Sequence, residues 1–351
     1  ASMLAGMASR GFNVIGVDIA ESTVNAVNEG RAPVHETGLE EMISAHRARV
    51  RATTSHEEAV LSSDVSFVIV PTPSDRRGAF ELQYAKYAFE QLGKALAKKD
   101  SYHVVVLTST VIPGATRHGL LPVLEATSGK KCGKDFGLCY GPEFIALGSV
   151  IRDFLNPDFY LVGEFDERCG DVLEEVNRKI CVKEPVVHRM SIENAEIAKI
   201  ALNSYVTMKI SFANTLADIC ERIPGGDVDV VSDAIGSDTR IGRKYLTGGL
   251  GFGGPCFTRD NVALGFLCEH VGVDGNLLVA NHHYNRSMAT RITTKIAPLL
   301  QMGQTAAVLG LSYKPLSHVV EGSQGVALAL AMAEAGMRVI GYDPLASDGA
   351  R

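Results

Sequence analysis

Short apolar segments alternate with helical segments through the first half of the chain, and this alternation limits the folds it can adopt. The apolar run Val65–Val70 ends at a Pro-Thr-Pro turn, Leu82–Ala97 has the pattern of a helix, and a second apolar run spans His103–Leu107. Apolar strands that alternate with helices are typical of a parallel sheet covered by helices. We therefore predict an α/β fold for this half of the chain.

Polar residues stand where three of the predicted strands end. Asp18 ends the strand Asn13–Asp18, Thr72 follows the run that ends at Val70, and Thr110 follows the run that ends at Leu107. In open parallel sheets, ligands bind in the crevice outside the carboxyl ends of the strands. We predict that Asp18, Thr72 and Thr110 lie along one such crevice.

Both ends of the sequence interrupt a strand and helix pattern. Residues 1–10 read as the middle of a helix that leads into the second strand of a βαβ unit. We expect that the given sequence lacks the first strand and the G-x-G-x-x-G turn, which would hold a pyrophosphate at a helix N-terminus. At the other end, Ala306–Leu311 reads as a strand, Gln324–Ala335 as a helix and Met337–Tyr342 as a strand. We expect the chain to be part of a longer protein.

Composition excludes several classes of function. With 351 residues, the chain has room for two or three domains of roughly 100–200 residues. Its net charge is −6 and it has no basic run, which argues against a nucleic-acid partner. Seven cysteines without a C-x-x-C pair indicate neither a disulfide framework nor a metal site, and fit a reducing cytoplasm. No apolar run reaches the ~18 residues of a membrane span.

A long helix is predicted in the middle of the chain. Ser191 is a suitable N-cap, and the helix runs from about Ile192 to Ile223, which would span nearly 50 Å at ~1.5 Å per residue. Apolar residues nearly encircle it, with Lys199 and Asn203 as polar exceptions on one face. Such a helix normally bridges domains. The two polar residues form either a place where one ligand touches both or a solvated polar stripe.

A glycine-rich segment presents a single cysteine. Residues 251–260 read G-F-G-G-P-C-F-T-R-D, so that Cys256 lies between a flexible turn and the acid Asp260. Glycines let backbone amides approach a ligand closely, and Pro255 fixes the chain that enters Cys256. The segment is either the loop of a nucleophilic thiol or a surface loop with an incidental cysteine.

These motifs together resemble those of the UDP-glucose/GDP-mannose dehydrogenase family over essentially the whole chain. The family's G-F-G-G-x-C-F-x-K-D segment is matched with Arg259 in place of lysine, and its K-x-x-x-N helix is matched by Lys199 and Asn203. The resemblance implies an N-terminal Rossmann-like NAD domain (residues 1–190), a central long-helix domain (191–296) and the start of a C-terminal α/β nucleotide-binding domain (297–351).

The resemblance implies an NAD-dependent oxidation of a nucleotide sugar at its 6-hydroxyl. Conversion of a primary alcohol to an acid takes two hydride transfers, and a cysteine holds the intermediate aldehyde as a thiohemiacetal and then a thioester. Cys256 would supply this thiol. Lys199 and Asn203 would stabilise the developing oxyanion, and Asp260 would hold Lys199 or a water in place.

The family's P-E-F-L-x-E loop is matched by residues 142–147, with a change at the second glutamate. Glu143 is retained as a candidate base for thioester hydrolysis, whereas Leu147 replaces the second acid. Glu143 and Thr110, through a bound water, remain as candidates for proton transfer.

An acidic residue at the position of Asp18 favours NAD over NADP, because it bonds the ribose hydroxyls and repels a 2′-phosphate. The residues expected to contact the cofactor are Asp18, Thr72, Pro73, Ser109 and Thr110.

Further departures concern the C-terminal part and the dimer. Glu321 stands where the family has an arginine that reaches towards the cofactor, and Thr23 stands where it often has a basic residue. Arg240 matches an arginine that reaches the sugar of the neighbouring subunit, so a homodimer or a higher homo-oligomer is implied. The residues expected to contact the substrate are Phe144, Ile145, Ala146, Leu147, Arg240, Tyr245, Phe252, Gly253, Gly254 and Lys314.

Alternatives to UDP-glucose oxidation remain open at this stage. The same scaffold serves GDP-mannose and N-acetylated sugar nucleotides, and Leu147 makes such a substrate plausible. A paralogue that binds a sugar nucleotide without turnover is a second alternative. A simple hydroxyacid dehydrogenase is less favoured because its reaction needs no thiol. The resemblance also implies a role in polysaccharide biosynthesis.

Overall fold

The computed structural model describes residues 1–301 and 304–350. The chain divides into two compact units, of which the first comprises Ala1–Asp75 with Phe80–Lys199, and the second comprises Arg76–Ala79 with the described residues from Ile200 onward. The division falls within the long helix α9 (Ile192–Cys220) rather than at its start. Because the second unit contains both the helices after α9 and the C-terminal segment, the three domain boundaries drawn from the sequence stay a prediction.

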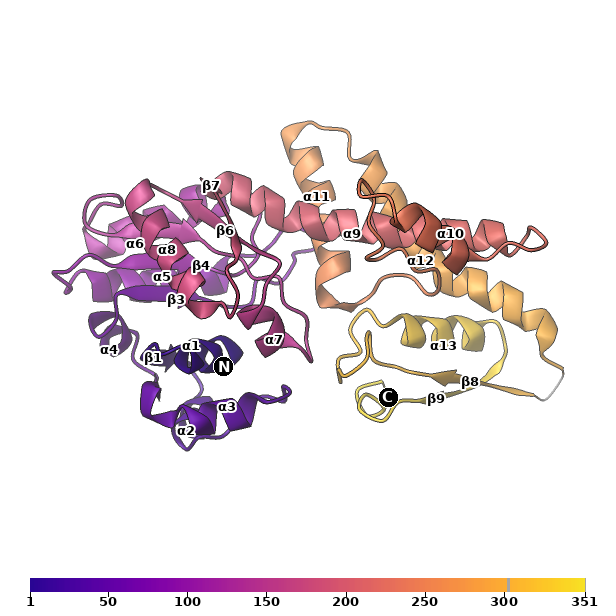
Figure 1. Ribbon diagram of the computed structural model, residues 1–351, viewed down its shortest axis with the longest axis horizontal. Helices are drawn as coiled ribbons and strands as arrows, with labels where there is room; N and C mark the ends of the chain where they lie inside the picture. The colour runs from indigo at the N-terminus through magenta and orange to yellow at the C-terminus, as the bar shows by residue number, and fades with distance from the viewer. Residues whose placement is uncertain (302–303, 351) are drawn as a thin grey trace. The chain divides into compact units, whose positions relative to one another are not determined.

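The first unit is built on a five-stranded sheet (Figure 1). Neighbouring strands are parallel except for β5 and β6, which are antiparallel. The predicted α/β fold is confirmed, with this one antiparallel pair as a departure from an all-parallel sheet. The strands, in their order across the sheet, are β3 (Val65–Val68), β4 (Val104–Leu107), β5 (Gly137–Tyr140), β6 (Phe159–Glu164) and β7 (Val186–Ser191).

Strand β4 shows why its sequence is continuously apolar. Val105 and Leu107 pack in the cluster that contains the core residues of α5 and α6, whereas Val104 and Val106 pack in a second cluster with Leu173 of α8. Successive side chains of a strand point to opposite faces, so a strand that is covered on both sides needs no polar position. The helices of this part are α5 (Gln83–Leu96), η2 (Ala115–Leu120), α6 (Leu121–Ser128), α7 (Val150–Leu155) and α8 (Glu167–Ile180).

The N-terminal residues of the first unit form a smaller layer. Its strands pair with each other in parallel, and in the described part of the chain neither is bonded to β3. The helix and strand predicted for residues 1–18 are both present. The elements of this layer are α1 (Ser2–Ser9), β1 (Val14–Val17), α2 (Glu21–Asn28), α3 (Leu39–Ala45), η1 (Arg47–Arg49), β2 (Val50–Thr53) and α4 (His56–Leu61).

Helices dominate the second unit. The predicted N-cap of α9 is confirmed, because the backbone N–H of Asn194 donates to Ser191 Oγ over 3.3 Å. Farther along α9, Thr207 accepts a hydrogen bond of 2.8 Å from Asn281, which also bonds Asn261 at 3.3 Å. This buried polar network joins three helices. The helices after α9 are α10 (Val228–Gly236), α11 (Gly254–Val271), α12 (Asn276–Ile296) and η3 (Ala297–Leu299).

The C-terminal segment of the second unit is a parallel strand, helix and strand motif, as predicted. It consists of β8 (Thr305–Leu309), α13 (Gln324–Glu334) and β9 (Arg338–Tyr342). Asp343, directly after β9, accepts hydrogen bonds from the backbone N–H groups of Leu311 and Ser312 at 2.8 and 2.9 Å. These bonds hold the pKa of Asp343 far below its usual range and fix the loop that follows β8.

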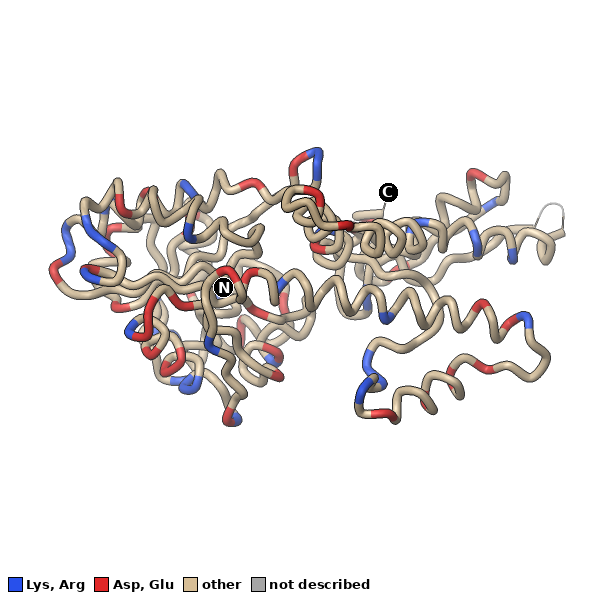
Figure 2. Tube along the Cα trace, turned by 90° about the horizontal axis from the view of Figure 1, so that it is seen from above, with Lys and Arg blue, Asp and Glu red and all other residues tan. Residues whose placement is uncertain are grey.

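Charged residues are interspersed along each unit. Figure 2 shows lysines and arginines among aspartates and glutamates, without a long stretch of one sign. Among the described residues, no helix combines the length and apolar composition that crossing a bilayer requires.

Candidate active site

Cys256 lies in the first turn of α11 and its side chain is exposed. The helix begins at Gly254, whose φ of +83° is unfavourable for other residues, and Pro255 occupies the next position. The positive end of the helix dipole favours a thiolate in this turn. The exposed thiol can therefore act as a nucleophile.

The glycines before Cys256 accommodate other parts of the protein. A Cβ atom at Gly253 would collide with the carbonyl oxygen of Gly322, and one at Gly254 would collide with the ring of Tyr313. The sequence suggested that these glycines serve a ligand. The structure shows a close approach of the protein's own backbone and an aromatic ring, so substrate contacts of Gly253 and Gly254 stay a prediction.

Asp260 joins the helix of Cys256 to the helix of Lys199. It lies one turn after Cys256 on α11, is completely buried, and accepts a hydrogen bond of 2.6 Å from Asn203 Nδ2. Arg259 Nε lies 3.3 Å from the other carboxylate oxygen and offsets the buried charge. Asp260 thus orients Asn203, a role that the sequence did not predict. Its role in holding Lys199 or a water stays a prediction.

Lys199 contacts the loop that follows β5. Its ammonium donates a hydrogen bond to the backbone carbonyl of Glu143 and lies 4.3 Å from the ring centroid of Phe144. The side chain is almost completely buried. The K-x-x-x-N helix and the P-E-F loop are therefore in direct contact, and the alternative that Lys199 belongs to a solvated stripe is excluded.

Glu143 turns its carboxyl group into the protein. One carboxyl oxygen is buried and has no hydrogen-bond partner among the described residues, and the group faces a narrow cavity lined in part by Phe67, Phe154 and Tyr160. Burial raises the pKa of Glu143 to about 7, against an opposing effect of the Lys199 charge. A carboxyl group with this pKa can exchange a proton with water near neutral pH, as a general base requires.

We expect turnover to rise with pH through about 7 and then level off, because a general base must be ionised and burial sets the pKa of Glu143 near that value. Glu143→Gln should lower turnover and remove this rise. The measurement is the pH dependence of kcat, with the alkylation rate of Cys256 over the same range to separate titration of the thiol. A wild-type rise that survives in Glu143→Gln would exclude this base.

The same substitution provides a stability control. The folded state raises the pKa of Glu143 from 4.5 to about 7, so it binds this proton more tightly than the unfolded state does. The unfolding free energy therefore falls as pH rises between these two values. Glu143→Gln should be more stable than the wild type at pH 8. Denaturant unfolding at pH 8 and pH 4 checks this difference.

The loops after β3 and β4 meet at the carboxyl edge of the sheet, which brings Thr72 and Thr110 together, whereas Asp18 follows β1 of the separate two-stranded sheet. A crevice shared by all three residues stays a prediction. Thr72 Oγ1 donates to the carbonyl of Thr110 over 2.7 Å, and Ser109 Oγ bonds both the N–H and the carbonyl of Val70 at 2.8 and 2.7 Å. Pro73 follows Thr72 in the same loop. These bonds fix the two loops against each other before any ligand binds.

Asp18 follows β1 and is half-buried. One carboxylate oxygen accepts a hydrogen bond of 2.8 Å from the N–H of Ala20 at the start of α2. Its acceptor capacity exceeds this single bond, since a carboxylate accepts about four. The acceptor oxygens of Asp18 thus fit the hydroxyl groups of a ribose.

Glu196 is a buried acid that the sequence analysis missed. It lies on α9 one turn before Lys199, and its carboxylate accepts hydrogen bonds from the N–H groups of Gly114 and Thr116 at 2.5 and 3.0 Å. These bonds hold the start of η2, shortly after Thr110. Burial raises the pKa of Glu196. Its partners are backbone N–H groups of a distant loop, so no side-chain pattern in the sequence indicated it.

The remaining predicted substrate residues occupy varied environments. Arg240 is 86% exposed and pairs with Asp238 over 2.6 Å, and Tyr245 is exposed with a φ of +68°. Phe252 is buried, whereas the loop residues Ile145, Ala146 and Leu147 are exposed. Lys314 lies 5.8 Å from the ring centroid of Tyr313. Their contacts with a substrate stay predictions.

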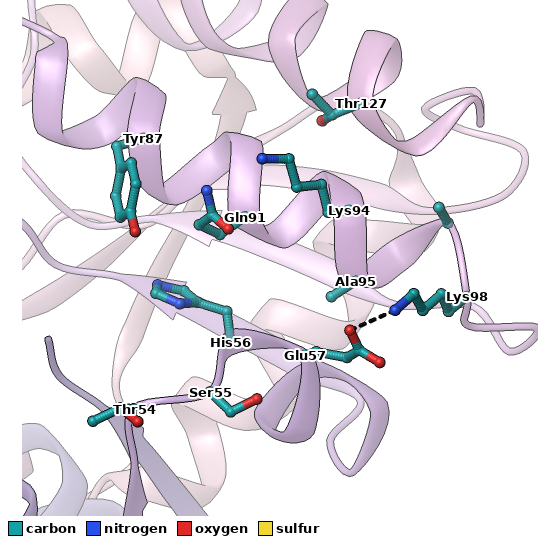
Figure 3. Close-up of a pocket in the computed structure, with 11 residues that line it drawn as sticks. Thr54, Ser55, His56, Glu57, Tyr87, Gln91, Lys94, Ala95, Lys98 and Thr127 are labelled. Atoms are coloured by element: carbon teal, nitrogen blue, oxygen red, sulfur yellow. Dashed lines mark hydrogen bonds and ion pairs between the residues drawn. The ribbon is translucent and has the colours of Figure 1, made fainter.

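One pocket of the first unit lies away from the predicted residues. It has a volume of about 660 Å³ and is lined mainly by α4 and α5, with His56 and Tyr87 facing each other and an ion pair of 2.6 Å between Lys98 and Glu57 (Figure 3). None of the predicted catalytic or cofactor residues lines it. The candidate active site is therefore identified from the hydrogen bonds and contacts among its residues, and not from this pocket.

Comparison with known proteins agrees with these features. Residues 1–181 match the NAD binding domain of the UDP-glucose/GDP-mannose dehydrogenase family, and residues 193–287 match its central domain. The UDP-glucose 6-dehydrogenase AglM of Haloferax volcanii is 37% identical over 98% of this chain and 80% of its own length. The GDP-mannose 6-dehydrogenase of Pseudomonas aeruginosa is 34% identical over 92% of this chain and 74% of its own.

A solved UDP-glucose dehydrogenase from the archaeon Pyrobaculum islandicum has the same fold. It superposes with a TM-score of 0.90 at 34% identity, covering 100% of this chain and 80% of that one. Fold and sequence together define an NAD-dependent oxidoreductase that acts on nucleotide sugars. The chain belongs to the UDP-glucose/GDP-mannose dehydrogenase family, whose members oxidise position 6 of the sugar.

Proposed function

We propose that the substrate is UDP-glucose and that Cys256 carries its 6-carbon between the two oxidation steps. Similarity to the Haloferax and Pyrobaculum UDP-glucose enzymes supports this substrate. The hydrogen bond between Asn203 and Asp260 is the main observation that supports the proposed active site. It joins Asn203 on α9 to the turn of α11 that follows Cys256, within the second unit.

The chain's residues have distinct tasks in this reaction. NAD, when bound, would accept one hydride in each oxidation, and the first oxidation also releases the proton of the 6-hydroxyl to solvent. The Cys256 thiolate adds to the aldehyde carbon, forming a C–S bond while the carbonyl oxygen gains a proton. Loss of that proton and of the second hydride converts the thiohemiacetal to a thioester. Water, deprotonated by Glu143, then attacks the thioester carbon, the C–S bond breaks, and the carboxylate and the thiol are released.

Lys199 and Asn203 stabilise the negative charge that develops on the substrate oxygen. Lys199 is pre-oriented by the carbonyl of Glu143, and Asn203 by Asp260, so neither side chain has to reorganise during the reaction. Asn203 uses one amide hydrogen for Asp260 and retains a second for the oxyanion.

GDP-mannose is the second candidate substrate. The 34% identity to the Pseudomonas enzyme supports it, and Leu147 replaces the second acid of the loop motif. Initial rates of NADH formation with UDP-glucose, GDP-mannose and UDP-N-acetylhexosamines decide between them. We expect kcat/KM to be at least tenfold higher with UDP-glucose, and a preference for GDP-mannose would reject the proposed substrate.

Asp18 is proposed to select NAD. It follows β1 and keeps acceptor capacity for the ribose hydroxyls, while its charge repels a 2′-phosphate. We expect kcat/KM to be much higher with NAD than with NADP, and Asp18→Ser to reduce this preference mainly through the KM for NAD. Equal efficiencies in the wild type would reject Asp18 as the selecting residue.

A homodimer is proposed from the exposed face of α9. Tyr205, Phe212 and Ile219 recur every seven residues and are 62, 54 and 48% exposed. Residues at this spacing lie on one helix face, and closed two-fold symmetry would place this stripe against its mate. Light scattering should find a dimer that Phe212→Glu weakens, and a monomeric wild type would contradict it. We also propose that Arg240 enters the sugar site of the partner subunit, that the protein is cytoplasmic, and that it acts in polysaccharide biosynthesis.

A further inference from the structure

The backbone of Phe252, four residues before Cys256, is held by a side chain of α12. The N–H of Phe252 donates to Asn285 Oδ1 over 2.7 Å, and Asn285 Nδ2 donates to the carbonyl of Phe252 over 2.9 Å. Both residues are buried, with 3 and 5% of their surface exposed. A paired amide of this kind holds both peptide groups that flank Phe252, and so fixes the backbone conformation of this residue.

A second side chain, from the C-terminal segment, shares the same carbonyl. Gln324 Nε2 donates to the carbonyl of Phe252 over 2.9 Å. The carbonyl oxygen has two lone pairs, and the amides of Asn285 and Gln324 occupy both. A Cβ atom at Gly251 would overlap the side-chain oxygen of Asn285 and approach that of Gln324. The loop is thus clamped between α12 and the first turn of α13.

Gln324 itself stands on a fixed element. It is the first residue of α13, whose N-cap Ser323 is buried and accepts a hydrogen bond of 3.2 Å from the N–H of Val326. At Gly325, a Cβ atom would collide with the carbonyl of Gly310, so the helix start is packed tightly against the end of β8. The Gln324 amide therefore has little freedom to move away from Phe252.

We propose that Gln324 is a positioning residue for Cys256. By bonding Phe252, it holds the loop that leads into α11, and so keeps the first helical turn formed around the thiol. The inference rests on the proposed function, in which Cys256 is the nucleophile. It assigns to the C-terminal segment an effect on thiol chemistry that is transmitted through the backbone of Phe252.

The test uses Gln324→Leu and Gln324→Glu, which both remove the N–H donor, with Gln91→Glu on α5 in the first unit as the matched control. We expect kcat to fall about five- to tenfold with KM changed less than about twofold, as loss of one buried hydrogen bond would produce. The pH midpoint of Cys256 alkylation by iodoacetamide should rise by about half a unit as the helix turn frays. Amide exchange of residues 252–256 should accelerate, and Gln91→Glu should change none of these.

Several outcomes would overturn the inference. If both variants kept the wild-type pH midpoint of Cys256 alkylation and the wild-type rate of amide exchange, Gln324 would not position the loop. A raised KM with unchanged kcat would make Gln324 a substrate contact instead. Alkylation and exchange are measured without substrate, so they still decide on Gln324 if UDP-glucose and Cys256 prove to have other roles.

Discussion

Replacing Cys256 with serine should abolish steady-state formation of NADH from the nucleotide sugar, with substrate binding close to that of the wild type. The thiol is exposed in the first turn of α11, where the helix N-terminus stabilises its anion. Serine keeps the volume but is a far weaker nucleophile at neutral pH, so neither the thiohemiacetal nor the thioester forms. The substitution removes little binding surface.

Steady-state NADH assays and calorimetric titration with UDP-glucose check both parts of this prediction. Cys268→Ser is the matched control, because Cys268 lies on the same helix three turns beyond Cys256 and is only partly exposed. The control should keep near wild-type turnover. Near-normal steady-state turnover in Cys256→Ser would contradict the thiol mechanism.

Lys199→Ala should lower turnover by 10²- to 10³-fold, about 2.7–4 kcal/mol, by analogy with the loss of an oxyanion donor. The buried ammonium is held by the carbonyl of Glu143 and the ring of Phe144, so its charge acts without reorganisation. Lys209→Ala is the matched control on the same helix, where the lysine bonds the carbonyls of Ile241 and Gly242 at 3.0 Å.

Comparison of kcat in the two lysine variants, with circular dichroism to confirm folding, separates a catalytic role from a structural one. A loss below tenfold in Lys199→Ala would show that the residue is structural. An equal loss in Lys209→Ala would assign the effect to α9 as a whole.

Local sequence signals predicted most of the elements. The α9 helix begins where Ser191 provides a cap, and the apolar runs before Thr72 and Thr110 form β3 and β4. Periodicity and capping depend on neighbouring residues, so the sequence displays them directly. The antiparallel pairing of β5 with β6 depends on contacts between distant segments, and no local pattern indicated it.

The candidate site was predicted residue by residue, but its internal contacts were not. Motif positions identified Cys256, Lys199 and Glu143, whereas the bond from Asn203 to Asp260 joins two helices that the sequence separates widely. Glu196 and Gln324 were missed for the same reason, since their partners are backbone groups of distant loops. Every residue type has backbone polar groups, so the sequence does not show which of them a side chain will bond.

The stoichiometry of the reaction tests the central claim most directly. With limiting UDP-glucose and excess NAD, the wild type should form two NADH for each uronic acid, and an aldehyde-trapping amine such as hydroxylamine should capture almost no intermediate. This result follows if Cys256 holds the 6-carbon from the first oxidation to the release of the acid. One NADH for each substrate, with the free aldehyde as product, would contradict the account.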